Sequence, residues 1–285
     1  MRLPEARQIL CSMLSDHFPE DMWKAFSNAE WDTLSQSALS EGLAPLLYWK
    51  LSKSGRLVSL PEPAQHALRA AYAQSWRQNQ RIIQELKDIS RQFEEAAIPT
   101  VVLKGACLIL TNYPDPGLRP MSDLDLMIPL EQLPEAVEIV KGLGFKQPFP
   151  EASPGLSDLL DHAVYLNKEG EVPIALELHR SLVAEGAFRY AVPVDWFWSQ
   201  TEIWQDDLQR QFGALRVLSP TAQILYASAH AALQHCGNRA LLVWYYDIDC
   251  LVRVHKENVD WDLLLSQAVE FEWASALRAS LIQTA

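Results

Sequence analysis

The sequence predicts an α+β protein in which a region of short strands lies between two helical regions. Apolar residues recur at helical spacing through residues 62–97, and helical spacing returns from residue 221 onward. Residues 98–219 instead contain several short runs that alternate in polarity or are β-branched. We therefore divide the chain into an N-terminal helical region (1–97), an α/β core (98–219) and a C-terminal helical region (220–285).

The N-terminal region is expected to consist of helices. The longest is predicted over residues 62–97, where large apolar side chains keep near-helical spacing. These side chains are Leu68, Tyr72, Trp76, Ile83, Leu86, Ile89 and Phe93. Pro99 ends this helix, because proline lacks the amide proton that a helix interior needs, and the first strand follows.

Residues 100–129 contain the most informative pattern in the chain. A β-branched run leads into Lys104-Gly105, and a Pro-rich loop leads into a strand that carries Asp123 and Asp125. Side chains alternate along a strand, so both aspartates point to one face. Neighbouring carboxylates repel each other unless a cation lies between them, and Mg²⁺ is commonly held by carboxylates and substrate phosphates. The alternative is an exposed strand whose carboxylates are solvated.

A second predicted strand, residues 174–179, adds polar groups of the same kind. Glu177 and His179 share one face of it, so Glu177 can serve as a third carboxylate of a two-metal site. His179 is expected either to orient Glu177 or to touch substrate, and a structural role is equally open. The strand is expected to form a hairpin with residues 162–168. His162 then either faces the site or makes a structural hydrogen bond.

The basic residues near the acidic strand suit phosphate. Lys104 and Arg119 lie on either side of the loop before it, and an arginine can donate to phosphate with two N–H groups. Gly105 opens a short apolar helix whose backbone amides could face an anion.

Further along, Ser219 and Pro220 are expected to cap and begin the helix that opens the C-terminal region. The Pro- and Ser-rich residues 148–158 are expected to form a loop over the site.

Charge and composition narrow the class of partner. Residues 1–100 hold 11 basic and 12 acidic residues, whereas residues 101–285 hold 13 and 24, so most of the net charge of −12 lies with the proposed site. Proteins that grip nucleic acid need a basic surface, so a nucleic-acid substrate is disfavoured. No apolar run is long enough to span a membrane, and the four scattered cysteines indicate reduced thiols. We expect a cytoplasmic protein.

Three motifs together resemble a known family. They are Leu103-Lys104-Gly105, then Tyr-Pro-Asp-Pro-Gly-Leu-Arg-Pro-Met-Ser-Asp-Leu-Asp over residues 113–125, then Leu-Glu-Leu-His over residues 176–179. This pattern resembles a poorly characterised bacterial nucleotidyltransferase family of the DNA polymerase β-like nucleotidyltransferase superfamily. The resemblance covers most of the chain. It implies a mixed β-sheet with helices.

The resemblance also implies an activity and a set of site residues. The activity is metal-dependent transfer of a nucleoside monophosphate from an NTP such as ATP to a small-molecule or protein acceptor. The implied metal is Mg²⁺ or Mn²⁺, and its ligands, which are also the catalytic residues, are Asp123, Asp125 and Glu177. The implied nucleotide-binding residues are Lys104, Gly105, Arg119, Ser122 and His179.

One departure from the superfamily keeps other functions open. The superfamily has Gly-Ser or Gly-Gly at the corner, whereas this chain has Lys104-Gly105-Ala106. Either Lys104 takes over the phosphate contact or the corner binds no phosphate. The second case favours a catalytically silent binding or regulatory module with the same fold. A weaker alternative is a small-molecule kinase. Residues 101–104 resemble the kinase strand that carries a lysine, but no Gly-rich phosphate loop precedes them.

Overall fold

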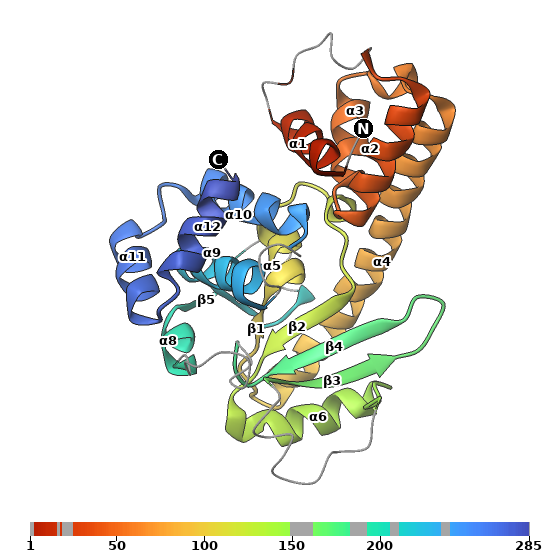
Figure 1. Cartoon of the computed structure of the whole chain (residues 1–285). Helices are drawn as coiled ribbons and strands as arrows, with labels where there is room; N and C mark the ends of the chain where they lie inside the picture. The colour runs from red at the N-terminus through yellow and green to blue at the C-terminus, as the bar shows by residue number, and fades with distance from the viewer. Residues whose placement is uncertain are drawn as a thin grey trace. The chain divides into compact units, whose positions relative to one another are not determined.

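The computed structural model of the chain (Figure 1) describes residues 3–15, 18, 25–148, 162–182, 193–205, 211–234 and 240–284. The chain forms two compact units. The first comprises Met1–Gln80, Tyr113–Pro120 and Leu241–Trp244, and the second comprises Arg81–Asn112, Met121–Ala240 and Tyr245–Ala285. Both units are therefore assembled from segments that are not contiguous in the sequence.

The first unit is helical. Its elements are α1 (Leu3–Leu14), α2 (Asn28–Ser40), α3 (Ala44–Lys53), η2 (Leu57–Ser59), the first part of α4 (Glu62–Glu95) and η3 (Pro116–Leu118). Ser27 caps α2 and exchanges hydrogen bonds with Glu30, which satisfies backbone N–H groups that the helix start leaves free. The three N-terminal helices contact one another through buried apolar residues such as Leu10, Leu34 and Leu47.

The second unit is built on a six-stranded mixed sheet. The strands are β1 (Val101–Val102), β2 (Asp123–Met127), β3 (Ala163–Lys168), β4 (Ile174–His179), β5 (Thr201–Ile203) and β6 (Arg216–Leu218). They follow the order β3-β4-β2-β1-β6-β5. β2 is parallel to β4 and β1 is parallel to β6, while the other neighbours are antiparallel. The predicted α+β class with a mixed sheet is confirmed.

The second unit also contains helices. They are the second part of α4, α5 (Lys104–Thr111), η4 (Leu130–Gln132), α6 (Leu133–Gly142), α8 (Val194–Ser199), α9 (Pro220–Ala229), the π-helix η6 (His230–Gln234), α10 (Leu242–His255), which begins in the first unit, α11 (Trp261–Glu270) and α12 (Ala274–Thr284). Ser219 accepts a hydrogen bond from the Ala222 amide and Pro220 is the first residue of α9, which confirms the predicted helix start.

The two faces of the sheet differ in polarity. Leu124 and Leu126 of β2 and Leu176 and Leu178 of β4 lie in one apolar core with residues of α4 and α6. That core removes apolar surface from water, which stabilises the unit. The alternate residues of β2 and β4 face the other way, and among them are the polar residues Asp123, Asp125, Glu177 and His179. The alternation expected for these strands therefore holds and sets the position of the polar site.

Several elements are helices or strands as predicted, but they begin or end at other residues than predicted. The long helix ends at Glu95, and β3 and β4 form the expected antiparallel hairpin. β1 is only two residues long, because α5 already begins at Lys104. Residues 149–158 of the predicted covering loop lie outside the described residues, and the division at residues 97 and 219 stays a prediction. Among the helices that the structure describes, none is long and apolar enough to cross a membrane.

Candidate active site

Two neighbouring parallel strands bring a pair of carboxylates together. β2 and β4 pair so that Asp125 lies opposite Glu177. Residues opposite each other in paired strands project to the same face of a sheet, so both carboxylates lie on the face that the apolar core leaves free. Asp125 is buried and Glu177 is partly exposed. The sheet therefore presents one sequestered and one accessible carboxylate side by side.

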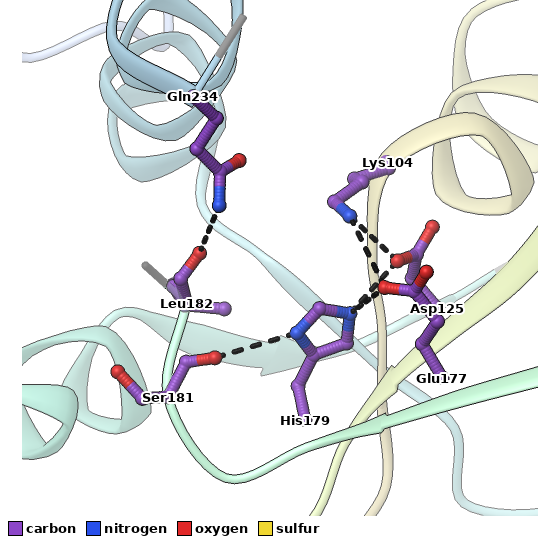
Figure 2. A network of polar contacts seen from close by, with 7 residues as sticks. All are labelled: Lys104, Asp125, Glu177, His179, Ser181, Leu182 and Gln234. Atoms are coloured by element: carbon purple, nitrogen blue, oxygen red, sulfur yellow. Dashed lines mark hydrogen bonds and ion pairs between the residues drawn. The ribbon is translucent and has the colours of Figure 1, made fainter. Parts of the chain in front are cut away.

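Lys104 lies between these two carboxylates (Figure 2). Its Nζ is 2.7 Å from Asp125 Oδ1 and 3.8 Å from Glu177 Oε2. The backbone N–H of Leu103 donates to the Asp125 carbonyl oxygen at 3.0 Å, which joins the corner before α5 to β2. Lys104 has a φ of 45°, in the left-handed region that residues other than glycine rarely adopt. Strained backbone of this kind concentrates at functional sites.

The imidazole of His179 contacts the same two acids. Its Nε2 is 2.8 Å from Asp125 Oδ1 and 3.3 Å from Glu177 Oε2, and its Nδ1 is 3.3 Å from the carbonyl oxygen of Ser181 (Figure 2). A carbonyl oxygen only accepts hydrogen bonds, so Nδ1 carries a proton in this contact. The fully buried ring is thus oriented with Nε2 toward the acidic pair.

Burial and charge act against each other on these groups. Burial raises the pKa of Asp125, but the Lys104 ammonium and the hydrogen bond from His179 outweigh burial, and the pKa lies well below its usual value. Burial lowers the pKa of Lys104, yet the nearby oxygens of Tyr226, Asp125 and Glu177 raise it overall. Lys104 is therefore cationic and Asp125 anionic at neutral pH. Burial likewise lowers the pKa of His179, but its hydrogen bonds to the two carboxylates raise it overall.

His162, for which the sequence left two roles open, lies beside His179. The ring centroids of the two histidines are 5.2 Å apart. The backbone N–H groups of Arg180 and Ser181 donate to the His162 carbonyl oxygen at 3.0 and 3.2 Å. Burial and the positive charges of His179 and Lys104 lower the pKa of His162 to about 4, so its ring is neutral at neutral pH. His162 therefore adds an uncharged imidazole to one side of the acidic pair.

Asp123 and Ser122 lie near this cluster at the start of β2. Asp123 is the first residue of the strand and pairs in register with Ala175. It lies one alternation before Asp125 and so shares the face of that carboxylate. Ser122 is exposed immediately before the strand. Asp123 therefore adds a carboxylate to the face on which Lys104 contacts Asp125 and Glu177.

The two remaining predicted phosphate contacts lie in different units. Gly105 is buried in the first turn of α5, directly after Lys104. Arg119 belongs to the first unit, where it is buried and its Nη1 donates to the Pro120 carbonyl oxygen at 3.1 Å. The side-chain amide of Asn79 donates to the Arg119 carbonyl oxygen at 2.8 Å. The second unit by itself therefore brings together Lys104, its neighbour Gly105 and the acidic pair.

One neighbour of the site gave no signal in the sequence. Tyr226 of α9 is buried, and its hydroxyl has no hydrogen-bond partner among the described residues. Burial raises its pKa, and Lys104 is close enough to oppose that rise. A single tyrosine in an apolar helix does not differ from an ordinary core residue, so only the fold reveals this hydroxyl beside the lysine.

The donor atoms of the site fit a divalent cation. Carboxylate oxygens are the ligands that Mg²⁺ and Mn²⁺ prefer, and Asp125 and Glu177 supply them side by side. In this structure the Lys104 ammonium supplies the positive charge between them. An ion bound to both carboxylates therefore has to share them with Lys104 or displace it. A second donor set, His162, Glu177 and His179, offers ligand atoms that all lie within 4.8 Å of one another.

Among the comparisons with known proteins, the family match agrees with the motifs. Residues 27–285 match the family described as "Uncharacterised nucleotidyltransferase". A search of curated proteins finds no match. The chain is similar to a solved structure, an antigenic nucleotidyltransferase-like protein from Paracoccidioides brasiliensis, with 15% identity over 70% of this chain and 92% of that chain and a TM-score of 0.41. Because the family match covers most of the sequence, this chain belongs to the uncharacterised nucleotidyltransferase family.

Proposed function

We propose that this protein is a metal-dependent nucleotidyltransferase that moves a nucleoside monophosphate from an NTP to a small-molecule or protein acceptor. The observation that carries the proposal is the buried, ionised Asp125 beside Glu177, with Lys104 at the strand-to-helix corner in contact with both. A structural ion pair needs only one acid for one lysine. Two acids that share one lysine and one buried histidine beside a strained corner are better explained by a reaction that handles phosphate charge.

Three carboxylates would hold the metal. Asp123, Asp125 and Glu177 provide oxygen donors on adjacent strands, and this donor set suits Mg²⁺ or Mn²⁺. A divalent ion bound there would help the acceptor oxygen to attack and would neutralise charge on the transferred phosphoryl group. In this proposal Glu177, the accessible member of the pair, takes the proton from an acceptor hydroxyl.

Lys104 has two successive tasks in this proposal. Before substrate binds, its ammonium keeps Asp125 ionised and compensates the buried charge. The negative charges of an entering triphosphate then compete with the carboxylates for that ammonium, so Lys104 can turn to a phosphate oxygen. The backbone amides at the start of α5, at Gly105, add donors for the same phosphates. Arg119, Ser122 and His179 remain proposed nucleotide contacts.

The charge distribution bears on the acceptor. Residues 101–285 carry 24 acidic and 13 basic residues, so the part of the chain with the site is strongly negative. A nucleic-acid backbone would be repelled by such a surface, because its binding rests on neutralising phosphates with Lys and Arg. We therefore propose a small molecule or a protein as acceptor.

The test follows the α-phosphate. Each NTP, labelled at the α-phosphate, is incubated with the full chain, Mg²⁺ or Mn²⁺, and extract fractions of small molecules and of proteins. We expect labelled acceptor and released pyrophosphate, and we expect Glu177→Gln to lower the rate by at least about 100-fold, because it removes a metal ligand and base. Glu171→Gln, an exposed acid in the turn of the same hairpin, is the matched control and should keep the rate. Equal rates for both variants would refute the role of Glu177. In a parallel incubation with γ-labelled NTP, transfer of the γ-label without transfer of the α-label would indicate a kinase.

One observation favours a second function, a catalytically silent binding or regulatory module. Lys104 already neutralises the carboxylates in the way that a metal ion would. Melting curves with NTP, with and without Mg²⁺, show whether the protein binds NTP at all and whether that binding needs the metal. A ligand at 100 times its dissociation constant stabilises a fold by about 2.7 kcal/mol. Stabilisation by NTP that needs no Mg²⁺, without any α-label transfer, would support the module, whereas Mg²⁺-dependent turnover would exclude it.

A further inference from the structure

We propose that His162, Glu177 and His179 form a binding site for a transition-metal ion of the Zn²⁺, Co²⁺ and Mn²⁺ class, next to the carboxylates of β2. Each of the three residues offers a ligand atom, and these atoms all lie within 4.8 Å of one another. This donor set differs from the oxygen-only set proposed for Mg²⁺, and the two sets have only Glu177 in common. The site does not depend on nucleotidyl transfer, because a silent module with this sheet would bind the ion equally.

The distances are close to those of a bound ion. Zn²⁺ binds imidazole nitrogen and carboxylate oxygen at about 2.0–2.2 Å, so two ligand atoms on one ion lie at most about 4.4 Å apart. His179 Nε2 and Glu177 Oε2 are 3.3 Å apart, well within this limit. The widest separation, at most 4.8 Å, closes by a small rotation of a side chain, and His162 is only half-buried.

The surroundings of His179 are those of a metal-binding histidine. A metal-bound imidazole generally donates its other ring N–H to a carbonyl or carboxylate, which sets the tautomer and the direction of the ring. The Nδ1 of His179 faces the Ser181 carbonyl at 3.3 Å and leaves Nε2 toward Glu177 (Figure 2). The following residue, Leu182, accepts a hydrogen bond at 3.4 Å from the side chain of Gln234 in η6, which ties this segment to the helix (Figure 2).

The two histidines are also held to each other by the backbone. The N–H groups of Arg180 and Ser181 both donate to the His162 carbonyl oxygen. The register of β3 and β4 places Ala163, the residue after His162, opposite His179. The site therefore sits on one hairpin, whose paired strands fix the spacing of its ligands more firmly than a loop would.

The chemistry of the donors selects the class of ion. Mg²⁺ prefers oxygen ligands and retains water, whereas two neutral imidazoles with one carboxylate suit Zn²⁺, Co²⁺ and Mn²⁺. When an ion takes His179 Nε2, the proton that this nitrogen shares with the carboxylates is released to solvent and its 2.8 Å contact with Asp125 is given up. Lys104 at 2.7 Å still compensates Asp125. Three protein ligands leave a coordination position for water or for a ligand oxygen.

The test measures metal binding itself. The full chain carrying Cys11→Ser, which removes an exposed thiol, is stripped with a chelator and titrated with Co²⁺ by visible absorption and with Zn²⁺ by calorimetry. We expect one saturable site, weakened at least about tenfold in His162→Gln and unchanged in His66→Gln, an exposed histidine of α4. A tenfold excess of Mg²⁺ should leave the bound Zn²⁺ in place.

Three results would overturn the proposal: no saturable Co²⁺ or Zn²⁺ binding, equal affinity in His162→Gln, or displacement of Zn²⁺ by Mg²⁺ at comparable concentration. A second measurement avoids substitution altogether. Half-buried His162 of the otherwise unmodified chain is acylated with diethyl pyrocarbonate and located by peptide mass spectrometry. Zn²⁺ should protect His162 and leave His66 reactive, and equal labelling of His162 with and without Zn²⁺ would contradict the site. Loss of nucleotidyl transfer alone has no bearing on either readout.

Discussion

Two buried acids, Glu41 in the first unit and Asp125 in the second, show different ways of placing a carboxylate inside a protein. Glu41 Oε2 accepts a hydrogen bond of 2.9 Å from the backbone N–H of Leu242, and Oε1 pairs with the guanidinium of Arg7. The Glu41 carbonyl oxygen also accepts from the Val243 N–H at 3.2 Å. A backbone donor cannot be replaced by a ligand without moving the chain. Glu41 therefore has a structural role, in which it links segments of its own unit.

Asp125 is equally buried, but its partners are of another kind. Both contacts on its Oδ1 come from side chains, Lys104 at 2.7 Å and His179 at 2.8 Å. Side chains can rotate away and give their place to a ligand or an ion. A second carboxylate, Glu177, lies beside it on the next strand. Burial of an acid is therefore a weak sign of function, whereas exchangeable partners next to a second acid are a stronger one.

The largest expected effect comes from removing the central cation. Lys104→Met leaves Asp125 and Glu177 without their ammonium, and breaking a buried ion pair costs about 3–5 kcal/mol of unfolding free energy. Urea unfolding in chelator would measure the loss, and Mg²⁺ or Mn²⁺ should restore more stability to this variant than to the wild type. Lys141→Met, which removes an exposed ion pair with Glu138 in the same unit, should change stability by less than about 0.5 kcal/mol. Equal stability of the two variants would show that Lys104 does not compensate the acids.

A smaller loss of unfolding free energy is expected from a substitution of Glu41. Glu41→Gln weakens charge-assisted bonds to Arg7 and to the Leu242 amide, at a cost of about 1.5–3 kcal/mol. Its response to NTP and to divalent ions should match the wild type, because Glu41 has no part in the site. Thermal melts with and without these ligands check both statements, and an altered ligand response would remove the contrast between the two acids.

The smallest effect is expected at the unpaired hydroxyl. Tyr226→Phe removes a buried donor without a partner, so the unfolding free energy should stay the same or rise by about 1 kcal/mol. Tyr72→Phe is the matched control, because the Tyr72 hydroxyl donates to Asp115 at 3.0 Å, and its loss should cost about 1 kcal/mol. If Tyr226→Phe lowered stability as Tyr72→Phe does, the hydroxyl would have a partner in solution, and its place beside Lys104 would need another explanation.

The hairpin and the polar face could be predicted because they rest on local patterns. Alternation in residues 123–128 and 174–179 identifies the buried leucines and places Asp125 and Glu177 on polar faces. The same patterns do not specify that Lys104 lies between the carboxylates, because the lysine is 21 residues from Asp125 in the sequence. Motif resemblance brought these residues together in the prediction, and the roles of Asp123, Ser122 and Arg119 still rest on it.

The sequence by itself determined the long helix, the strands that carry Asp125 and Glu177, the polar side of those two strands, the acidic charge of the second half and the family of the chain. Only the tertiary structure decided that Lys104 and His179 share Asp125, that His162 joins Glu177, and that the Tyr226 hydroxyl is buried beside them. The reason is physical. Periodicity along the chain reports which side of an element meets the core, whereas strand order and register are settled by contacts between distant segments.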